Sequence, residues 1–156
     1  MIKKIISSEK ALQKAENFCA YQERSQQEVR DKIYSWGLHQ ADVENILSTL
    51  ITNGFLKEGR FASAFTSGKL RIKKWGRNKI REALRGKKVS EPLIRKALSE
   101  IDEREYEKIL KDVIRIRSKN VVEKNPLKRN YKIASYAISR GFEAEMVWET
   151  ISQLAD

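Results

Sequence analysis

The chain has 156 residues and a formal charge of +11, from 32 Lys and Arg against 21 Asp and Glu. Hydrophobic residues make up 40% of it, which is enough for a packed core and excludes wholesale disorder. Two prolines and seven glycines argue against a turn-rich β-sandwich or barrel. Abundant Ala, Leu, Glu, Lys and Arg favour an all-α fold instead.

The rarer residues restrict the kinds of site that the chain can build. A single cysteine, Cys19, and a single histidine, His39, exclude an internal disulfide and a zinc site with two imidazoles. No apolar run is long enough to span a membrane, and the apolar stretch within residues 1–8 is too short for a signal peptide. We therefore expect a cytoplasmic protein. Without a Gly-rich phosphate loop or a nucleophile beside a base, we expect no enzyme, cofactor or metal.

Residues 9–54 predict three amphipathic helices. The first has apolar residues at helical spacing over 11–22. The second begins at a capping box, Ser25-x-x-Glu28, and ends at Gly37, where a left-handed cap is expected. The third stops at Gly54 and has its apolar residues on one face, at Val43, Ile46, Leu47 and Leu50.

This three-helix pattern repeats along the chain. The apolar residues 6, 10 and 13 positions after Gly37 are matched by three at the same offsets after Gly141. In the middle of the chain, the corresponding apolar residues lie 8, 12 and 15 positions after Gly86. This spacing predicts a loop two residues longer than in the other two units, with Ser90 as the N-cap of the next helix. We expect three units, 1–58, 59–101 and 102–156, stacked into an elongated array of nine helices. The matching residues are Val43, Leu47 and Leu50, then Ile94, Leu98 and Ile101, then Val147, Ile151 and Leu154.

The opening helices of the second and third units are less regular. The second unit is expected to open with a helix that has Phe61, Phe65, Ile72 and Trp75 on its apolar face and ends at Gly76. The third is expected to open with Tyr106, Ile109, Leu110, Val113 and Ile116. The three tryptophans, Trp36, Trp75 and Trp148, are expected at helix ends, where they pack between units.

The positive charge is concentrated in the middle unit. Residues 61–100 contain 12 basic and 3 acidic side chains, a net of +9, whereas the two flanking parts each have a net of +1. Arg77, Arg81 and Arg85 are four residues apart and predict a stripe on one helix face. The candidate residues for an anionic partner are Lys69, Lys73, Lys74, Arg77, Lys79, Arg81, Arg85 and Lys88.

Two interpretations of this basic stripe compete. A charged helix face is usually just solvated, but like charges four residues apart repel, and no neighbour in the sequence neutralises them. An anionic partner therefore explains the stripe better, either nucleic-acid phosphates or an acidic protein groove. A membrane surface fits less well, because the helix has no broad apolar face to spare.

Other polar residues favour structural roles. The acidic residues at 102–107 fit the first turn of a helix better than a metal site, because its dipole favours negative charge there. His39 fits a surface or capping position and Cys19 fits the core.

Three segments of the sequence contain spaced motifs in a definite order. They are Ala20-Tyr21 through Arg24-Ser25-x-x-Glu28-Val29-x-x-Lys32-Ile33, Asn53-Gly54-Phe55-Leu56-Lys57-Glu58-x-Arg60-Phe61-Ala62 and Lys74-Trp75-Gly76-Arg77-x-Lys79-Ile80-x-x-x-Leu84. Together they resemble the RecX family of bacterial regulators of the RecA recombinase, whose motifs have the same order and approximate spacing over nearly the whole chain. At Lys57 and Glu58 the family usually has two acids, so helix capping or a partner contact differs there.

The resemblance implies a helical array, expected to be a monomer, that binds RecA filaments on DNA in recombination, DNA repair and the SOS response. It implies lower RecA ATPase and strand exchange, and blocked filament extension or promoted disassembly, without a cofactor. The alternative is a helix-turn-helix module that acts on single- or double-stranded DNA directly. In the first unit, the helix that would read the DNA begins with Gln40, Asp42 and Glu44. Acidic residues there would repel DNA phosphates, which favours the RecA regulator over the helix-turn-helix module.

Overall fold

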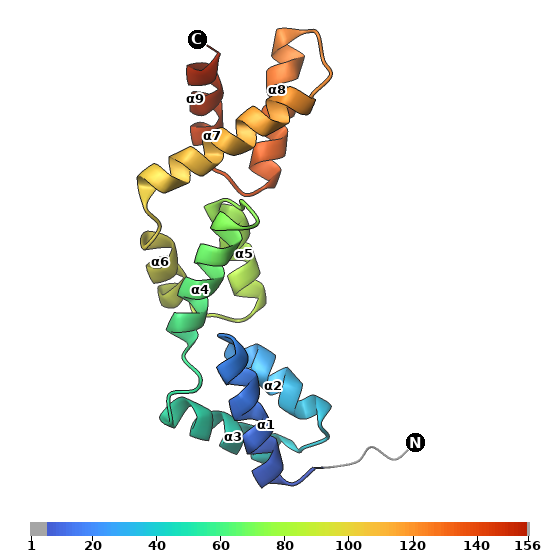
Figure 1. Cartoon of the computed structure of the whole chain (residues 1–156), viewed down its shortest axis with the longest axis vertical. Helices are drawn as coiled ribbons and strands as arrows, with labels where there is room; N and C mark the ends of the chain where they lie inside the picture. Colours follow the sequence, from blue (N-terminus) through green and yellow to red (C-terminus); the bar gives the residue numbers. More distant parts are fainter. Residues whose placement is uncertain (1–5, 156) are drawn as a thin grey trace.

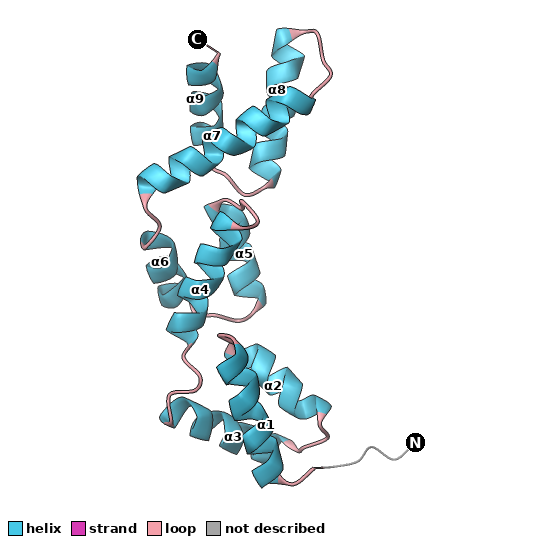
Figure 2. Cartoon of the chain, in the orientation of Figure 1, coloured by secondary structure: helices cyan, strands magenta, loops and turns pink. Residues whose placement is uncertain are grey.

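The structure is a computed structural model that describes residues 6–155. Residues 1–5 and 156, which include most of the segment judged too short for a signal peptide, lie outside the described part. Within it there are nine helices and no strand, which confirms the all-α class (Figure 1, Figure 2). The helices are α1 (Ser8–Tyr21), α2 (Gln26–Ser35), α3 (Gln40–Thr52), α4 (Glu58–Arg71), α5 (Arg77–Gly86), α6 (Glu91–Ser99), α7 (Glu103–Asn120), α8 (Pro126–Ser139) and α9 (Ala144–Leu154).

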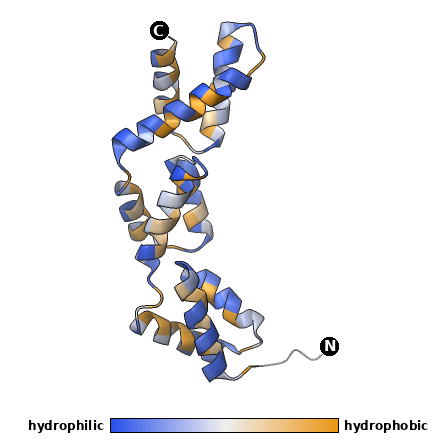
Figure 3. Cartoon of the chain, viewed as in Figure 1, coloured by the Kyte–Doolittle hydropathy of each residue, from blue (hydrophilic) through white to orange (hydrophobic). Residues whose placement is uncertain are grey.

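The molecule is elongated, with its helices in three successive groups along the longest axis (Figure 1). The first unit, α1–α3, lies at the N-terminal end, the second unit, α4–α6, in the middle, and the third unit, α7–α9, at the C-terminal end. Apolar and polar residues alternate along the helices, as Figure 3 shows, so each helix has a face to bury. Among the described residues, no helix is both long and apolar enough to cross a membrane.

The hydrophobic core is divided in two rather than three. The first unit has its own core, which includes Cys19, as expected. The second and third units share one continuous core, in which Tyr106 and Phe142 meet edge to face with ring centroids 5.3 Å apart. Because apolar burial is the main source of stability, the second and third units form one body and the first unit a separate one.

The capping box predicted at Ser25 is present. The Glu28 backbone N–H donates to Ser25 Oγ at 3.0 Å, and the Ser25 N–H donates to Glu28 Oε1 at 3.4 Å. Three of the glycines that end helices have positive φ, namely Gly37, Gly54 and Gly141, at 89°, 77° and 101°. This backbone conformation favours glycine and explains why the helices stop there.

In the second unit the cap glycine was assigned wrongly. Gly86 is the last residue of α5, and the left-handed cap residue is Lys88, with φ of 60°. The Val89 N–H donates to the carbonyl of Leu84 at 3.1 Å, just as the Phe142 N–H donates to that of Ala137 in the third unit. Counted from Lys88, the apolar residues of α6 lie 6, 10 and 13 positions on, as in the other units. The loop is therefore not longer.

Several finer expectations are also wrong. Helix α4 ends at Arg71, short of Gly76, Lys74 adopts a positive φ in the loop that follows, and Ile72 is exposed. In α7 the buried residue is Ile114 rather than Ile116. Trp148 lies within α9 and is 43% exposed, so it does not pack between units.

The first and second units meet through polar contacts at the start of α4. The Gln26 backbone N–H donates to the Glu58 carboxylate at 2.5 Å, and Arg60 pairs with Glu23 at 2.9 Å. Burial raises the pKa of Glu58, although the bond from Gln26 works against that rise. Lys57, at the position where the resemblance expects an acid, is the N-cap of α4 and makes no side-chain capping bond.

We predict that Lys57→Asp raises the free energy of unfolding by about 1 kcal/mol, because an aspartate can accept a hydrogen bond from a first-turn N–H and its charge suits the helix dipole. Chemical denaturation followed by circular dichroism measures the change. Lys57→Gln removes the charge without adding a good cap and is the matched control. Equal effects of the two substitutions would contradict the capping explanation.

We also predict that Lys88→Gly raises the free energy of unfolding by about 1 kcal/mol, because only glycine adopts the left-handed conformation without steric cost. Lys88→Ala keeps the Cβ atom but removes the charge, and should leave the denaturation midpoint near that of the wild type. If the alanine variant gains as much as the glycine variant, charge rather than backbone strain controls stability at this turn.

Candidate partner-binding surface

The predicted basic residues occupy the end of α4, the loop after it, α5 and the turn before α6. We call the eight of them the basic centre: Lys69, Lys73, Lys74, Arg77, Lys79, Arg81, Arg85 and Lys88. The structure brings only some of them to one surface, and it places two of them in ion pairs within the protein.

Trp75 brings two of these lysines together from different elements. The ammonium of Lys69 lies 4.8 Å from the centroid of the indole ring and that of Lys79 lies 4.7 Å from it. Such cation–π contacts each contribute about 0.5–1 kcal/mol at exposed sites. Trp75 also packs against the shared core, so it fixes the two charges relative to the fold.

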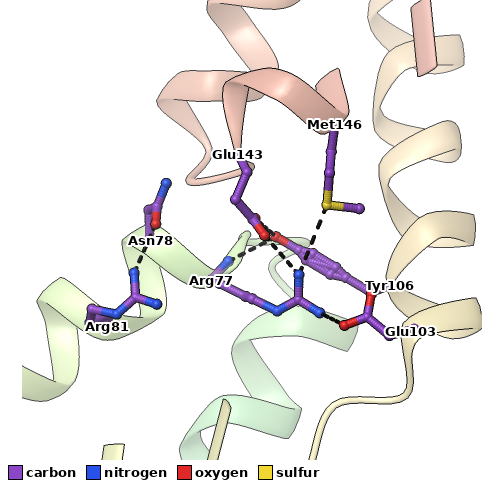
Figure 4. Close-up of polar contacts among 7 residues, drawn as sticks. All are labelled: Arg77, Asn78, Arg81, Glu103, Tyr106, Glu143 and Met146. Carbon is purple, nitrogen blue, oxygen red and sulfur yellow. Dashed lines mark hydrogen bonds and ion pairs between the residues drawn. The ribbon is translucent and has the colours of Figure 1, made fainter. Parts of the chain in front are cut away.

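Arg77 points into the junction between the second and third units (Figure 4). Its guanidinium donates to Glu143 Oε2 at 2.7 Å and to Glu103, and lies 3.9 Å from the centroid of the Tyr106 ring. The Tyr106 hydroxyl donates to the same Glu143 carboxylate and accepts from the Arg77 backbone N–H at 3.0 Å. Only 16% of the Arg77 side chain is exposed.

Charge and burial shift the pKa values in this network. Burial, and then the bond to Glu143, raise the pKa of Tyr106 far above its ordinary value. For Arg77, burial acts to lower the pKa, but the bond to Glu143 and the charges of Glu143 and Glu103 outweigh it and raise the pKa. Arg77 is thus fully charged and neutralised inside the protein.

Two glycines let the backbones of the two units touch beside Arg77. The Gly76 N–H donates to the carbonyl of Arg140 at 2.8 Å, and the Asn78 N–H donates to that of Gly141 at 3.0 Å. A Cβ atom at Gly76 would overlap the backbone of Gly141, and one at Gly141 would overlap Lys79. Only glycine therefore permits this contact.

The expectation that no neighbour in the sequence neutralises the arginine stripe is wrong for Arg85, and residues distant in sequence neutralise Arg77 as well. Arg77 pairs with Glu103 and Glu143, which are distant in sequence, and Arg85 pairs with Glu91 at 2.6 Å and with Glu82 at 3.1 Å. Arg81 points away from the junction and contacts the amide oxygen of Asn78 at 2.8 Å (Figure 4).

Six members of the basic centre keep their charge available. Within residues 6–155, none of the six has a carboxylate within 4.0 Å. Two of the six, Lys69 and Lys73, line a groove of about 450 Å³ between the first and second units, together with Phe65. We call the six the open basic set: Lys69, Lys73, Lys74, Lys79, Arg81 and Lys88.

Sequence reasoning did not find the partners of Arg77. Glu103 was placed in an acidic cluster explained by the helix dipole, yet it pairs with Arg77, and its neighbour Glu105 pairs with Arg71 of α4 at 2.6 Å. Glu143 was assigned no role. The one available signal was that the acids of the third unit gather at 102–107 and 143–149, the two segments that lie against the basic second unit.

The fold and this surface define an all-α protein made of successive three-helix groups that presents a basic surface. Residues 11–50 match a family model described as the first three-helix domain of RecX, and residues 58–98 match the second. The chain belongs to the RecX family of regulatory proteins.

Individual relatives agree with this assignment. The chain is 27% identical to the regulatory protein RecX of Prosthecochloris aestuarii, over 93% of each chain. It is 25% identical to that of Clostridium tetani, covering 84% of this chain and 59% of the longer relative. The crystal structure of RecX from Lactobacillus salivarius has the same fold, with a TM-score of 0.84 and 19% identity over 95% of this chain and 96% of that one.

We predict that Arg77→Gln lowers the free energy of unfolding by about 1–3 kcal/mol, because it leaves the partly buried carboxylate of Glu143 without its charged partner and removes the cation from the face of the Tyr106 ring. Arg81→Gln removes the same charge four residues away and should change stability by less than about 0.5 kcal/mol. Thermal and urea denaturation of both variants measure the difference. Equal losses would mean that the Arg77 contacts contribute nothing specific.

Proposed function

We propose that the protein binds RecA filaments on DNA and mainly inhibits them, lowering ATP hydrolysis, strand exchange and filament extension. Membership of the RecX family of regulatory proteins supports the regulatory part of this proposal. The open basic set, in the middle of an elongated molecule, is the single observation that supports a nucleoprotein filament as the partner.

An elongated molecule can contact several successive protomers of a filament at once. Linked contacts raise the overall affinity well above that of each contact alone, provided that their spacing fits. The open basic set would then meet DNA phosphates or an acidic protein groove from the middle of the molecule. Bound in this way, the protein shifts the filament toward one state only to the extent that it binds that state more tightly.

The helix-turn-helix alternative is less well supported. In the first unit the second helix of such a pair is α3, whose first turns contain Asp42 and Glu44. Glu44 already accepts from Arg30 Nε at 2.9 Å, and the rest of its charge would repel phosphates. Helix α3 therefore presents no basic residue suited to reading a DNA groove.

We predict that substoichiometric amounts of this protein lower DNA-dependent ATP hydrolysis by the RecA of the same organism. A coupled ATPase assay on single-stranded DNA measures the rate. An unchanged rate with saturating protein would refute the regulatory proposal.

The charge of the open basic set is tested in the same assay. Lys73→Glu combined with Arg81→Glu should lose most of the inhibition, because neither residue supports the fold through an ion pair. Lys10→Glu combined with Lys108→Glu changes the net charge equally elsewhere and should inhibit like the wild type. Arg77 and Arg85 are left intact, because their substitution would disturb internal ion pairs. If both double variants inhibit equally, the open basic set does not contact the filament.

A further inference from the structure

The third unit is electrically polarised, although its net charge is nearly zero. Residues 113–132 contain seven basic residues and one acid, Glu123. The rest of 101–156 contains four basic residues and nine acids. We call residues 119–132 the basic tip. It comprises the end of α7, the loop after it and the first turns of α8, and lies at the far end of the molecule from the N-terminus (Figure 1).

Three large apolar side chains of the basic tip are exposed. Val122, Leu127 and Tyr131 have relative exposures of 94%, 81% and 67%. Leu127 and Tyr131 are one turn apart on α8 and share its outer face, because residues four apart on a helix are neighbours. The opposite face of α8 buries Ile133 and Ala137 in the shared core. The outer face therefore has no role in packing the described fold.

The lysines around these side chains are also available. Lys119, Lys124 and Lys128 are exposed, and among the described residues none has a carboxylate within 4.0 Å. The ammonium of Lys132 pairs with Glu123 at 3.2 Å. Lys128 lies in the first turn of α8, which contains no acid, so the positive end of the helix adds to the local potential.

Internal hydrogen bonds hold the basic tip in a defined conformation. The Arg129 guanidinium donates to the carbonyls of Val121, at 2.8 Å, and of Ser118, and to Ser118 Oγ at 3.0 Å. The Asn125 side chain caps α8 by accepting from the N–H groups of Leu127 and Lys128, at 3.0 and 3.1 Å. A surface held in this way loses little conformational entropy when it binds a partner.

A groove continues from the basic tip along the third unit. Its volume is about 400 Å³, and it lies between α7, α8 and the end of α9. Arg115, Lys119 and Asn130 are among its polar lining residues, and Ile133 and Leu154 are among its apolar ones. Lys119 belongs both to the basic tip and to this groove, so a strand that extends from the tip along the groove would meet more positive charge at Arg115.

We propose that the basic tip binds single-stranded nucleic acid, with Tyr131 stacking on an unpaired base and Lys119, Lys124 and Lys128 contacting the phosphates on either side. A single strand offers both features that this surface matches, repeated negative charge and exposed base faces. A duplex hides the base faces, and a lipid surface would require a broader apolar face than Val122 and Leu127 provide. The proposal goes beyond the regulatory function, since it needs no recombinase and lies outside the residues that the family models match.

The test is binding of a fluorescent 20-nucleotide poly-dT strand to the full chain, measured by anisotropy without recombinase. Tyr131→Ala should weaken binding by roughly 5- to 150-fold, the range for loss of one stacked base, whereas Tyr131→Phe should bind like the wild type. Lys124→Gln combined with Lys128→Gln should reduce the slope of log affinity against log salt by about 1.4, from about 0.7 per phosphate contact on single strands. Lys10→Gln combined with Lys108→Gln is the control and should leave the slope unchanged.

The same experiment identifies the competing partners. No binding by the wild type, or equal binding by Tyr131→Ala and the wild type, overturns the proposal. Equal affinity for a duplex of the same length also overturns it, because stacking would then contribute nothing. A different result would identify lipid as the partner. In that case the wild type does not bind poly-dT but binds vesicles containing phosphatidylserine, and Leu127→Asp abolishes the vesicle binding. Since no recombinase is present, failure here leaves the ATPase test of the proposed function unaffected.

Discussion

The structure depends most on the contact of Gly76 with Gly141 and on the ion pairs of Arg77 beside it. Backbone hydrogen bonds cross this junction because Gly76 and Gly141 have no side chains to keep the two backbones apart. Beside them, Glu143 and Tyr106 contact the guanidinium of Arg77. The second and third units therefore share one hydrophobic core. The first unit has a separate core and meets the second through the contacts of Glu58 and Arg60 and the ion pair of Lys87 with Glu28.

Internal ion pairs, at the junction and within the second unit, divide the basic residues of the chain into two groups. Arg77 and Arg85 are neutralised within the protein, so they stabilise the fold and are not available to a partner. The open basic set and the basic tip remain, one in the middle of the molecule and one at its end (Figure 1). Because both lie on units that share one core, a partner that contacts both would be held at a spacing that the core sets.

Local features were predictable from the sequence, whereas contacts across units were not. The capping box at Ser25 and the caps at Gly37 and Gly141 depend on residues a few positions apart, and the sequence predicted them correctly. The cap at Lys88 was missed because a lysine rarely adopts positive φ, so the repeat was aligned on the wrong residue. The pairing of Arg77 with Glu143 spans 66 residues, and only tertiary structure brings the two together. A charge count by segment also hid the polarity of the third unit.

The central claim is that the Gly76–Gly141 junction fuses the second and third units into one cooperative body. Native-state hydrogen exchange of the backbone amides of Gly76 and Asn78 tests it most directly, because these amides donate across the junction. We expect both to exchange only when the shared core unfolds, at the same free energy as amides in the middle of α5 and α8. If they exchange much faster than those amides while the two helices stay protected, the units open independently and the account is wrong.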